Sequence, residues 1–294
     1  MAKISVIINT WNEEENIKRC LESVRRIANE IIVVDMYSKD RTTAIAKKLG
    51  AKVFFYKYMS YADPAKNFAF RQAQGDWILS LDADEEIPPL LAKMLQDLAQ
   101  DSKDLAYLRI PRKNIIFGKW IKHSRWWPDY VIRFFKKGAV RWSEKIHSVP
   151  LTRGEGRDLE AKEVNAIVHH HYQSISQYLE RMNRYTGIQA EELIKTGYKF
   201  RWQDMLRKPM GEFLSRFFVG EAYKDGLHGL VLALLQAFSE MIKYIKVWEK
   251  EKFIEQDISS YHEVLEENIN DYLHWQVKVS GLIGKIRLKI KKKI

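Results

Sequence analysis

The chain has 294 residues, of which 46% are hydrophobic and 12% aromatic, and it carries a formal net charge of +11. Such a chain can bury a sizeable core, which excludes a disordered protein and a disulfide-stapled miniprotein. Its single cysteine, Cys20, permits neither an intramolecular disulfide nor a multi-cysteine zinc site, so we expect a reducing compartment. The apolar run that begins at Ile4 lacks the cleavage pattern of a secretory signal, and a cytoplasmic protein is therefore expected.

The first hundred residues alternate short apolar runs with amphipathic segments. In chain order we predict strands at residues 4–8, 30–35, 52–56 and 77–81, and helices at 13–26, 40–49, 64–73 and 88–100. Asn12 is the expected N-cap of the first helix, and Pro64 falls in the first turn of the third. This alternation is typical of βαβ units on a mostly parallel sheet.

The regular alternation ends after about residue 105. Aromatic segments at residues 105–110, 130–135, 140–142 and 164–169 suit strands and loops that close over the end of a parallel sheet, where open α/β folds place their ligands. From Ser174 onward the pattern is helical. We therefore expect an α/β domain over residues 1–200 and a helical region over residues 201–294.

Two carboxylates follow the fourth predicted strand, in Asp82-Ala83-Asp84. Residues i and i+2 of an extended chain point the same way, so both carboxylates can face one hard cation. The carboxyl end of a strand also places them at the ligand-binding crevice of an α/β sheet. This geometry suits a divalent metal and a phosphate, and the alternative is a solvated acidic turn that caps the next helix.

Three segments in the first 85 residues carry a family resemblance. They are Thr10-Trp11-Asn12-Glu13-Glu14, Val34-Asp35 with Ser38-Lys39-Asp40, and the run from Gly75 through Asp82-Ala83-Asp84 to Glu85. In this order and at these separations they resemble the family-2 inverting glycosyltransferases. The resemblance implies a GT-A fold with a Rossmann-like, mostly parallel central sheet, and it makes residues 1–200 the catalytic domain.

The resemblance also implies a site for a nucleotide-sugar. The base and ribose would lie along Thr10, Asn12, Glu14 and Asp35. Lys66 and Asn67 would flank the diphosphate and the base, and Asp82 and Asp84 would lie at the ribose and the metal. There Asp84 would ligate a Mg²⁺ or Mn²⁺ that bridges the diphosphate, and Asp82 would contact the ribose or the metal. Met36-Tyr37 stands where the family often has Asp-Gly or Asp-Ser, a departure that affects the base contacts.

A second stretch, from Trp127-Pro128-Asp129 through Arg133 to Lys145-Ile146-His147-Ser148, resembles the branch of lipopolysaccharide-core glucosyltransferases. Ser148 stands where that branch has a glutamate, which would be the natural general base. An inverting transfer needs a carboxylate that takes the proton of the acceptor hydroxyl. We rank Asp129 first for this role and Glu144 second, and Glu85 is a third candidate. His147 is expected either to ligate the metal or hold the phosphate, or to be a structural histidine.

Three consecutive histidines, His169, His170 and His171, invite a zinc interpretation. Consecutive residues of an extended segment point to alternate faces, so the three rings cannot all reach one ion. We expect one or two of them to line the donor or acceptor site and the rest to pack.

The carboxyl-terminal third contains two apolar stretches. The uncharged run at residues 226–239 has fourteen residues, too few for a helix to cross a bilayer, which takes about 20. The aromatic run at residues 213–219 suits a helix lying in a membrane interface, and the alternative is a helical hairpin packed on the catalytic domain or on another subunit. Six cations and no acid between Lys285 and Lys293, beside isoleucines at three- and four-residue spacing, suit an anionic membrane surface.

The leading hypothesis from the sequence is a metal-dependent inverting glycosyltransferase. Its donor would be a nucleotide-sugar, a UDP-sugar in the first instance, and its acceptor a hydroxyl of a cell-envelope or lipid-linked glycan such as lipopolysaccharide core. It would be peripheral on the cytoplasmic face of the inner membrane. A nucleotidyltransferase and a non-enzymatic module that binds through its basic tail are the alternatives. No nucleic-acid-binding motif is visible, and the oligomeric state stays open.

Overall fold

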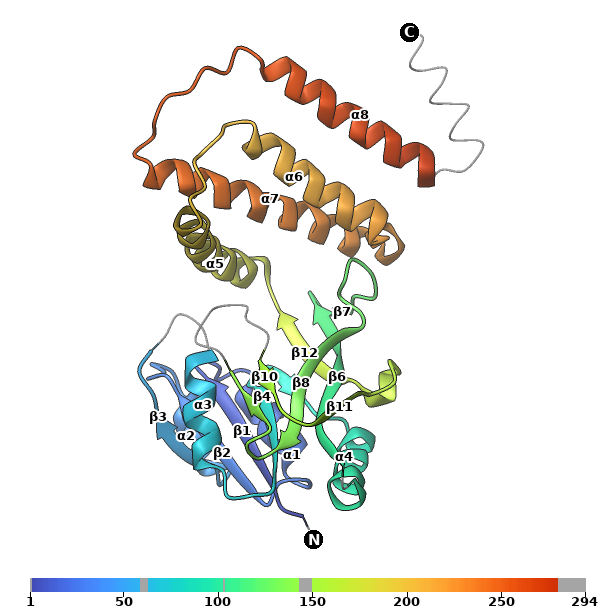
Figure 1. Ribbon diagram of the computed structural model, residues 1–294. Helices are drawn as coiled ribbons and strands as arrows, with labels where there is room; N and C mark the ends of the chain where they lie inside the picture. The colour runs from blue at the N-terminus through green and yellow to red at the C-terminus, as the bar shows by residue number, and fades with distance from the viewer. Residues whose placement is uncertain (1, 59–62, 103, 143–149, 280–294) are drawn as a thin grey trace. The chain divides into compact units, whose positions relative to one another are not determined.

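The structure is a computed structural model that describes residues 2–58, 63–102, 104–142 and 150–279. It divides into two compact units (Figure 1). Unit 1 is formed by Met1–Ile116 and Trp127–His171, and unit 2 by Phe117–Trp126 and Tyr172–Ile294. The boundary expected near residue 200 lies inside unit 2, between the helices α5 (Ile175–Lys195) and α6 (Asp204–Leu214). Glu144, His147, Ser148 and the basic tail lie outside the described residues.

One half of the sheet in unit 1 is parallel. It contains β1 (Ile4–Thr10), β2 (Glu30–Asp35), β3 (Lys52–Phe55) and β4 (Trp77–Asp82) in the order β3-β2-β1-β4. The register aligns Thr10 with Asp35 and Asn9 with Asp82, so the polar ends of the three inner strands lie at one edge. β1 is buried along its whole length, as expected of a parallel strand covered on both faces.

Helices cover both faces of this half. Ile4, Val6 and Ile8 pack on one side with α1 (Ile17–Val24), α2 (Thr42–Lys48) and α4 (Pro89–Asp101). Ile7 faces the other side, against α3 (Asp63–Gln72). The alternation of side chains along β1 thus builds a three-layer α/β arrangement, and the predicted α/β fold class is confirmed.

The prediction that Asn12 caps the first helix is wrong. α1 begins at Ile17, and Asn16 occupies the N-cap position without a side-chain capping bond. Asn12 has a left-handed backbone with φ of 52°, and its Oδ1 accepts the backbone N–H of Lys39 at 2.8 Å. The side chain therefore ties the loop after β1 to the loop after β2, and it is not available to the helix.

The other half of the sheet is largely antiparallel. β8 (Asp129–Lys136) pairs with β4, and β6 (Leu105–Ile116) pairs with β8. The order continues through β12 (Ile167–Tyr172) to the two-residue strand β5 (Glu85–Glu86), while β11 (Glu155–Asp158) pairs with β6. β9 (Val140–Arg141) and β10 (Leu151–Thr152) form a separate pair. β6 is six residues longer than predicted, and the strand expected at residues 164–169 starts after the 3₁₀ turn η1 (Glu163–Asn165).

Unit 2 is predominantly helical, as predicted from Ser174 onward. α5 begins with a true cap, because Ser174 Oγ accepts the N–H of Gln177 at 3.1 Å. After α6 come the π-helical turn η2 (Ser215–Val219), the 3₁₀ turn η3 (Ala222–Asp225), α7 (Leu227–Lys250) and α8 (Tyr261–Val279). Phe200, Trp202 and Val264 belong to the core of this unit. Buried Asp225 holds the loop that follows β7 (Lys119–Trp120), where it accepts the N–H groups of Lys122 and His123.

The two apolar stretches of the carboxyl-terminal third lie in these helices. The uncharged run is the first half of α7, and Leu227, Leu234 and Phe238 on it are exposed. None of the described helices, α7 included, combines the length and hydropathy that crossing a bilayer requires. The aromatic run ends α6 and forms η2, where Phe218 is buried and Phe217 stacks on Phe213 at 5.3 Å. Part of that run is thus committed to packing inside unit 2.

Candidate active site

Asp35 anchors the loop that follows β2. The carboxylate is fully buried, and it accepts the N–H and the hydroxyl of Ser38 at 2.7 and 2.5 Å. The hydroxyl of Ser38 in turn accepts the backbone N–H of Asn12 at 2.7 Å. These bonds lock together the two loops at the carboxyl ends of β1 and β2, where the sequence predicts the base of a nucleotide.

Thr10 and Glu14 flank this pair of loops. Thr10 is buried at the end of β1, and no described residue makes a hydrogen bond with its Oγ1. Glu14 is held at the surface, where its Oε2 accepts the backbone N–H of Arg41 at 3.0 Å and the guanidinium N–H at 3.1 Å. The backbone bond and the guanidinium lower the pKa of Glu14, so this carboxyl group stays ionised.

Lys66 and Asn67 lie on α3, on the other side of the same edge. Asn67 pairs with both backbone groups of Trp142, with distances of 2.7 and 2.9 Å, and so holds the end of the segment after β9. The ammonium group of Lys66 lies 4.8 Å from the centre of the Trp142 ring, and Lys66 is largely buried. A buried cation at this edge is suited to an anionic group such as a diphosphate.

Asp82 belongs to a buried group of charges at the end of β4. The guanidinium of Arg133, on β8, bonds to Asp82 and to Oε1 of Glu85, the latter at 2.8 Å. Oε2 of Glu85 accepts the backbone N–H of Asp82 at 3.0 Å. Burial raises the pKa of Asp82, but the charges of Arg133 and Lys66 outweigh it and lower that pKa. The same ion pairs outweigh burial at Arg133 and raise its pKa.

Asp84 lies beside two of the three consecutive histidines. β5 pairs with β12, and the backbone N–H of His170 donates to the carbonyl oxygen of Asp84 at 2.9 Å, which brings the two segments together. His169 Nε2 lies 3.6 Å from Asp84 Oδ1. One side-chain ligand atom each of Asp84, His169 and His171 lies within 4.8 Å of the others, so the three can hold one metal ion.

The alternation of a strand explains which histidines gather there. His169 and His171 are two residues apart and share a face of β12, whereas His170 points away and contacts Glu86 at 3.1 Å. Partial burial outweighs the contact with Glu86 and lowers the pKa of His170. One carboxylate and two imidazoles form a donor set better suited to a transition ion such as Mn²⁺ than to Mg²⁺, which prefers oxygen ligands.

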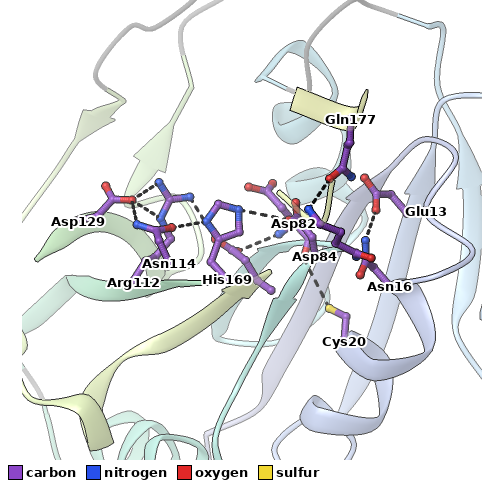
Figure 2. Close-up of polar contacts among 12 residues, drawn as sticks. Glu13, Asn16, Cys20, Asp82, Asp84, Arg112, Asn114, Asp129, His169 and Gln177 are labelled. Carbon is purple, nitrogen blue, oxygen red and sulfur yellow. Dashed lines mark hydrogen bonds and ion pairs between the residues drawn. The ribbon is translucent and has the colours of Figure 1, made fainter. Parts of the chain in front are cut away.

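Asp129 is the centre of a polar cluster at the start of β8 (Figure 2). Its Oδ2 accepts two N–H groups of Arg112, at 2.9 and 2.6 Å, and the amide N–H of Asn114 at 3.1 Å. Asn114 Oδ1 lies 2.6 Å from His169 Nδ1. Arg112 also reaches Glu85 Oε1 at 3.4 Å, so the cluster continues into the charges around Asp82.

The structure thus arranges the predicted site residues in two groups. Thr10, Asn12, Glu14 and Asp35 lie at the ends of β1 and β2, and Asp82, Asp84 and Asp129 lie with the charges around β4 and β8. Arg112 and Asn114 were not among the residues predicted from the sequence. They lie beyond residue 110, where the predicted strand ended; in a longer strand, their i and i+2 spacing would have placed both side chains on one face.

The chain is similar to known proteins in sequence and in structure. The family model described as Glycosyl transferase family 2 matches residues 5–153. An uncharacterized glycosyltransferase of Rickettsia typhi is 32% identical over 85% of this chain and 88% of its own length. The lipopolysaccharide core biosynthesis glycosyltransferase LpsC of Rhizobium meliloti is 23% identical over 84% of this chain and 92% of its own. Glucosyl-3-phosphoglycerate synthase from Mycobacterium tuberculosis aligns with a TM-score of 0.33 at 23% identity, over 40% of this chain and 45% of that one.

Proposed function

Because this chain belongs to Glycosyl transferase family 2, we propose that its unit 1 moves a sugar from a nucleotide-sugar, a UDP-sugar in the first instance, to a hydroxyl group of an acceptor with inversion. The family makes the chain a glycosyltransferase and sets aside the nucleotidyltransferase and the non-enzymatic binding module. The observation that carries the finer proposal is the convergence of Asp84, His169 and His171 beside the charges around Asp82.

The nucleotide would lie along the carboxyl ends of β1, β2 and β4. Asp35 and Asn12 support the loops next to the base, and the buried hydroxyl of Thr10 supplies a further polar group at that end. Lys66 supplies a positive charge for the diphosphate, close enough to Asp82 to lower the pKa of that carboxyl group. This placement agrees with the rule that open α/β sheets bind ligands outside the carboxyl ends of their strands.

The donor set around Asp84 fits a divalent ion. Asp84, His169 and His171 would hold it, and Asp82, paired with Arg133, would lie next to it. When bound, such an ion neutralises the charge that develops on the departing nucleoside diphosphate. His147 lies outside the described residues, so its part in the metal site stays a prediction.

Asp129 is our first candidate for the group that takes the proton of the acceptor hydroxyl. Its Oδ2 is occupied by Arg112 and Asn114, and no hydrogen bond from a described residue reaches Oδ1. Glu85 is the weaker candidate, because both its oxygens accept hydrogen bonds and its side chain is completely buried. Glu144, ranked second from the sequence, lies outside the described residues.

The acceptor we propose is a hydroxyl of a cell-envelope or lipid-linked glycan such as lipopolysaccharide core. The similarity to LpsC along most of both chains supports this choice. We also propose that the enzyme is peripheral on the cytoplasmic face of the inner membrane. The exposed residues Leu227, Leu234 and Phe238 of α7 would enter the interface, and the six cations between Lys285 and Lys293 would contact anionic headgroups.

A screen of nucleotide-sugars against the full chain tests the donor and the metal together. A donor that binds the folded state raises the apparent melting temperature by mass action, and we expect this rise to require Mn²⁺. Slow release of nucleoside diphosphate from the same sugar, without an acceptor, would identify it as a substrate. If no nucleotide-sugar gives either signal with Mn²⁺ or Mg²⁺, the proposed donor and metal dependence are wrong.

A further inference from the structure

Asn114 connects Asp129, the centre of the polar cluster, to His169. Its side chain lies between Asp129 and His169 (Figure 2). Asn114 is fully buried and His169 is 4% exposed, so bulk water cannot substitute for the bonds that they make with each other. A wrongly oriented amide at this position would leave buried polar atoms without hydrogen-bond partners, which is unfavourable.

The orientation of the Asn114 amide follows from Asp129. A carboxylate oxygen that faces a guanidinium can only accept hydrogen bonds there, and Oδ2 of Asp129 already accepts two N–H groups of Arg112. The atom of Asn114 that faces Asp129 must therefore be the amide nitrogen, at 3.1 Å from Oδ2. The amide oxygen then has to face His169.

The protonation of the His169 ring follows in the same way. The amide oxygen of Asn114 can only accept, so His169 Nδ1, 2.6 Å away, must carry a hydrogen. In a neutral imidazole the proton is then absent from Nε2, which presents a lone pair. Nε2 is the ring nitrogen that lies 3.6 Å from Asp84 Oδ1.

From this chain of contacts we infer that Asn114, oriented by Asp129, is a positioning residue that fixes the tautomer of His169 with the Nε2 lone pair toward the metal site at Asp84. The inference rests on the proposed function, in which Asp84 and His169 bind a divalent ion. Groups that orient a metal-ligating histidine typically change metal affinity by 10–100-fold when they are removed.

The first experiment measures Mn²⁺ affinity of the full chain by calorimetry or by electron paramagnetic resonance, without a donor. Asn114→Leu removes both amide contacts while keeping the branched shape of the side chain, and we expect it to weaken Mn²⁺ binding by about 10–100-fold. Asn165→Leu is the matched control. Asn165 is a buried asparagine of unit 1 whose amide donates to the carbonyl oxygen of Glu160 at 3.0 Å, so this variant should bind Mn²⁺ as the unchanged protein does.

The second experiment reads the tautomer itself. In metal-free protein labelled with ¹⁵N-histidine, at a pH where the imidazoles are neutral, the ¹⁵N shifts should show His169 protonated on Nδ1. His169→Gln identifies the signal. Asn114→Leu should move this signal toward the tautomer protonated on Nε2. A general loss of structure would not produce this specific shift.

A second variant protects the test if Asn114→Leu does not fold. Asp129→Ala removes the acceptor that orients the Asn114 amide, so the orientation of that amide is no longer imposed and Mn²⁺ affinity should fall. Unchanged Mn²⁺ affinity in the folded variants, or a His169 ring protonated on Nε2 in the unchanged protein, overturns the inference while the proposed function stands. Absence of Mn²⁺ binding in the unchanged protein overturns the proposed metal site itself, and the inference with it.

Discussion

Unit 1 and unit 2 use polar and apolar residues in opposite ways. Unit 1 buries charged side chains, among them Lys66, Glu85 and Arg133, and gathers them at one edge of its sheet. Unit 2 carries most of the large apolar side chains that are exposed, among them Leu227, Leu234 and Phe238 on one helix. Buried charges are costly unless they are paired, and exposed apolar patches mark contact surfaces. The difference agrees with the proposal that unit 1 carries the chemistry and that unit 2 attaches the protein to a surface.

The strongest test of this division is at Asp84. Asp84→Asn removes the charge of the one carboxylate in the Asp84, His169 and His171 group, so sugar transfer should fall by about 10³-fold or more while the chain stays folded. Initial rates and Mn²⁺ titration measure the effect, and EDTA should reproduce it in the unchanged protein. Asp97→Asn, at an exposed position of α4, is the matched control. Activity retained by Asp84→Asn would remove the metal role.

Arg133 tests whether the buried charges of unit 1 depend on one another. Arg133→Met leaves Glu85 and Asp82 without their shared partner, and breaking such a buried pair costs about 3–5 kcal/mol in the free energy of unfolding. Urea denaturation measures the loss. Arg41→Met removes a largely exposed arginine from its pair with Glu14, and it should leave the midpoint nearly unchanged. Equal midpoints for the two variants would contradict the paired-charge interpretation.

Asp129 tests which carboxylate of unit 1 acts on the acceptor. At saturating Mn²⁺, which compensates for any loss of metal affinity, Asp129→Asn should lower turnover by about 10²-fold or more with little change in donor affinity. Steady-state kinetics with varied donor separate the two effects. If Glu144→Gln behaves in this way and Asp129→Asn does not, the ranking of the two carboxylates is reversed.

The parts of this protein that the sequence predicted are those with local signals. The strand at residues 30–35 was predicted to the residue, because an apolar run and a terminal Asp35 mark it without help from the rest of the chain. The fold class followed from the same kind of pattern. The helix start at Ile17 was missed, because Asn12 serves a contact with Lys39 that no local rule contains.

His169 and Asn114 show more clearly what cannot be predicted from local sequence. His169 was considered as a site residue, but its pairing with Asp84 depends on β5 and β12 lying side by side, across more than 80 residues of chain. The contact between Asn114 and Asp129 depends in the same way on the register between β6 and β8. Side-chain alternation could predict which residues share a face, but strand register decides which faces meet.

The smallest expected effect on chemistry comes from unit 2 and the tail. Removal of residues 280–294 takes away the six cations between Lys285 and Lys293, so flotation with anionic vesicles should fall several-fold and weaken further as salt rises. Leu234→Glu, on the exposed face of α7, should reduce flotation with neutral vesicles as well, because it puts a charge where apolar burial is needed.

Hydrolysis of free donor should stay unchanged in both variants, whereas transfer to a lipid-anchored acceptor should fall. A matched change at a site that is already exposed and charged, Glu255→Gln, should alter neither. Equal flotation of all chains would assign the exposed face of α7 to a protein contact and would leave the chemistry of unit 1 as it is.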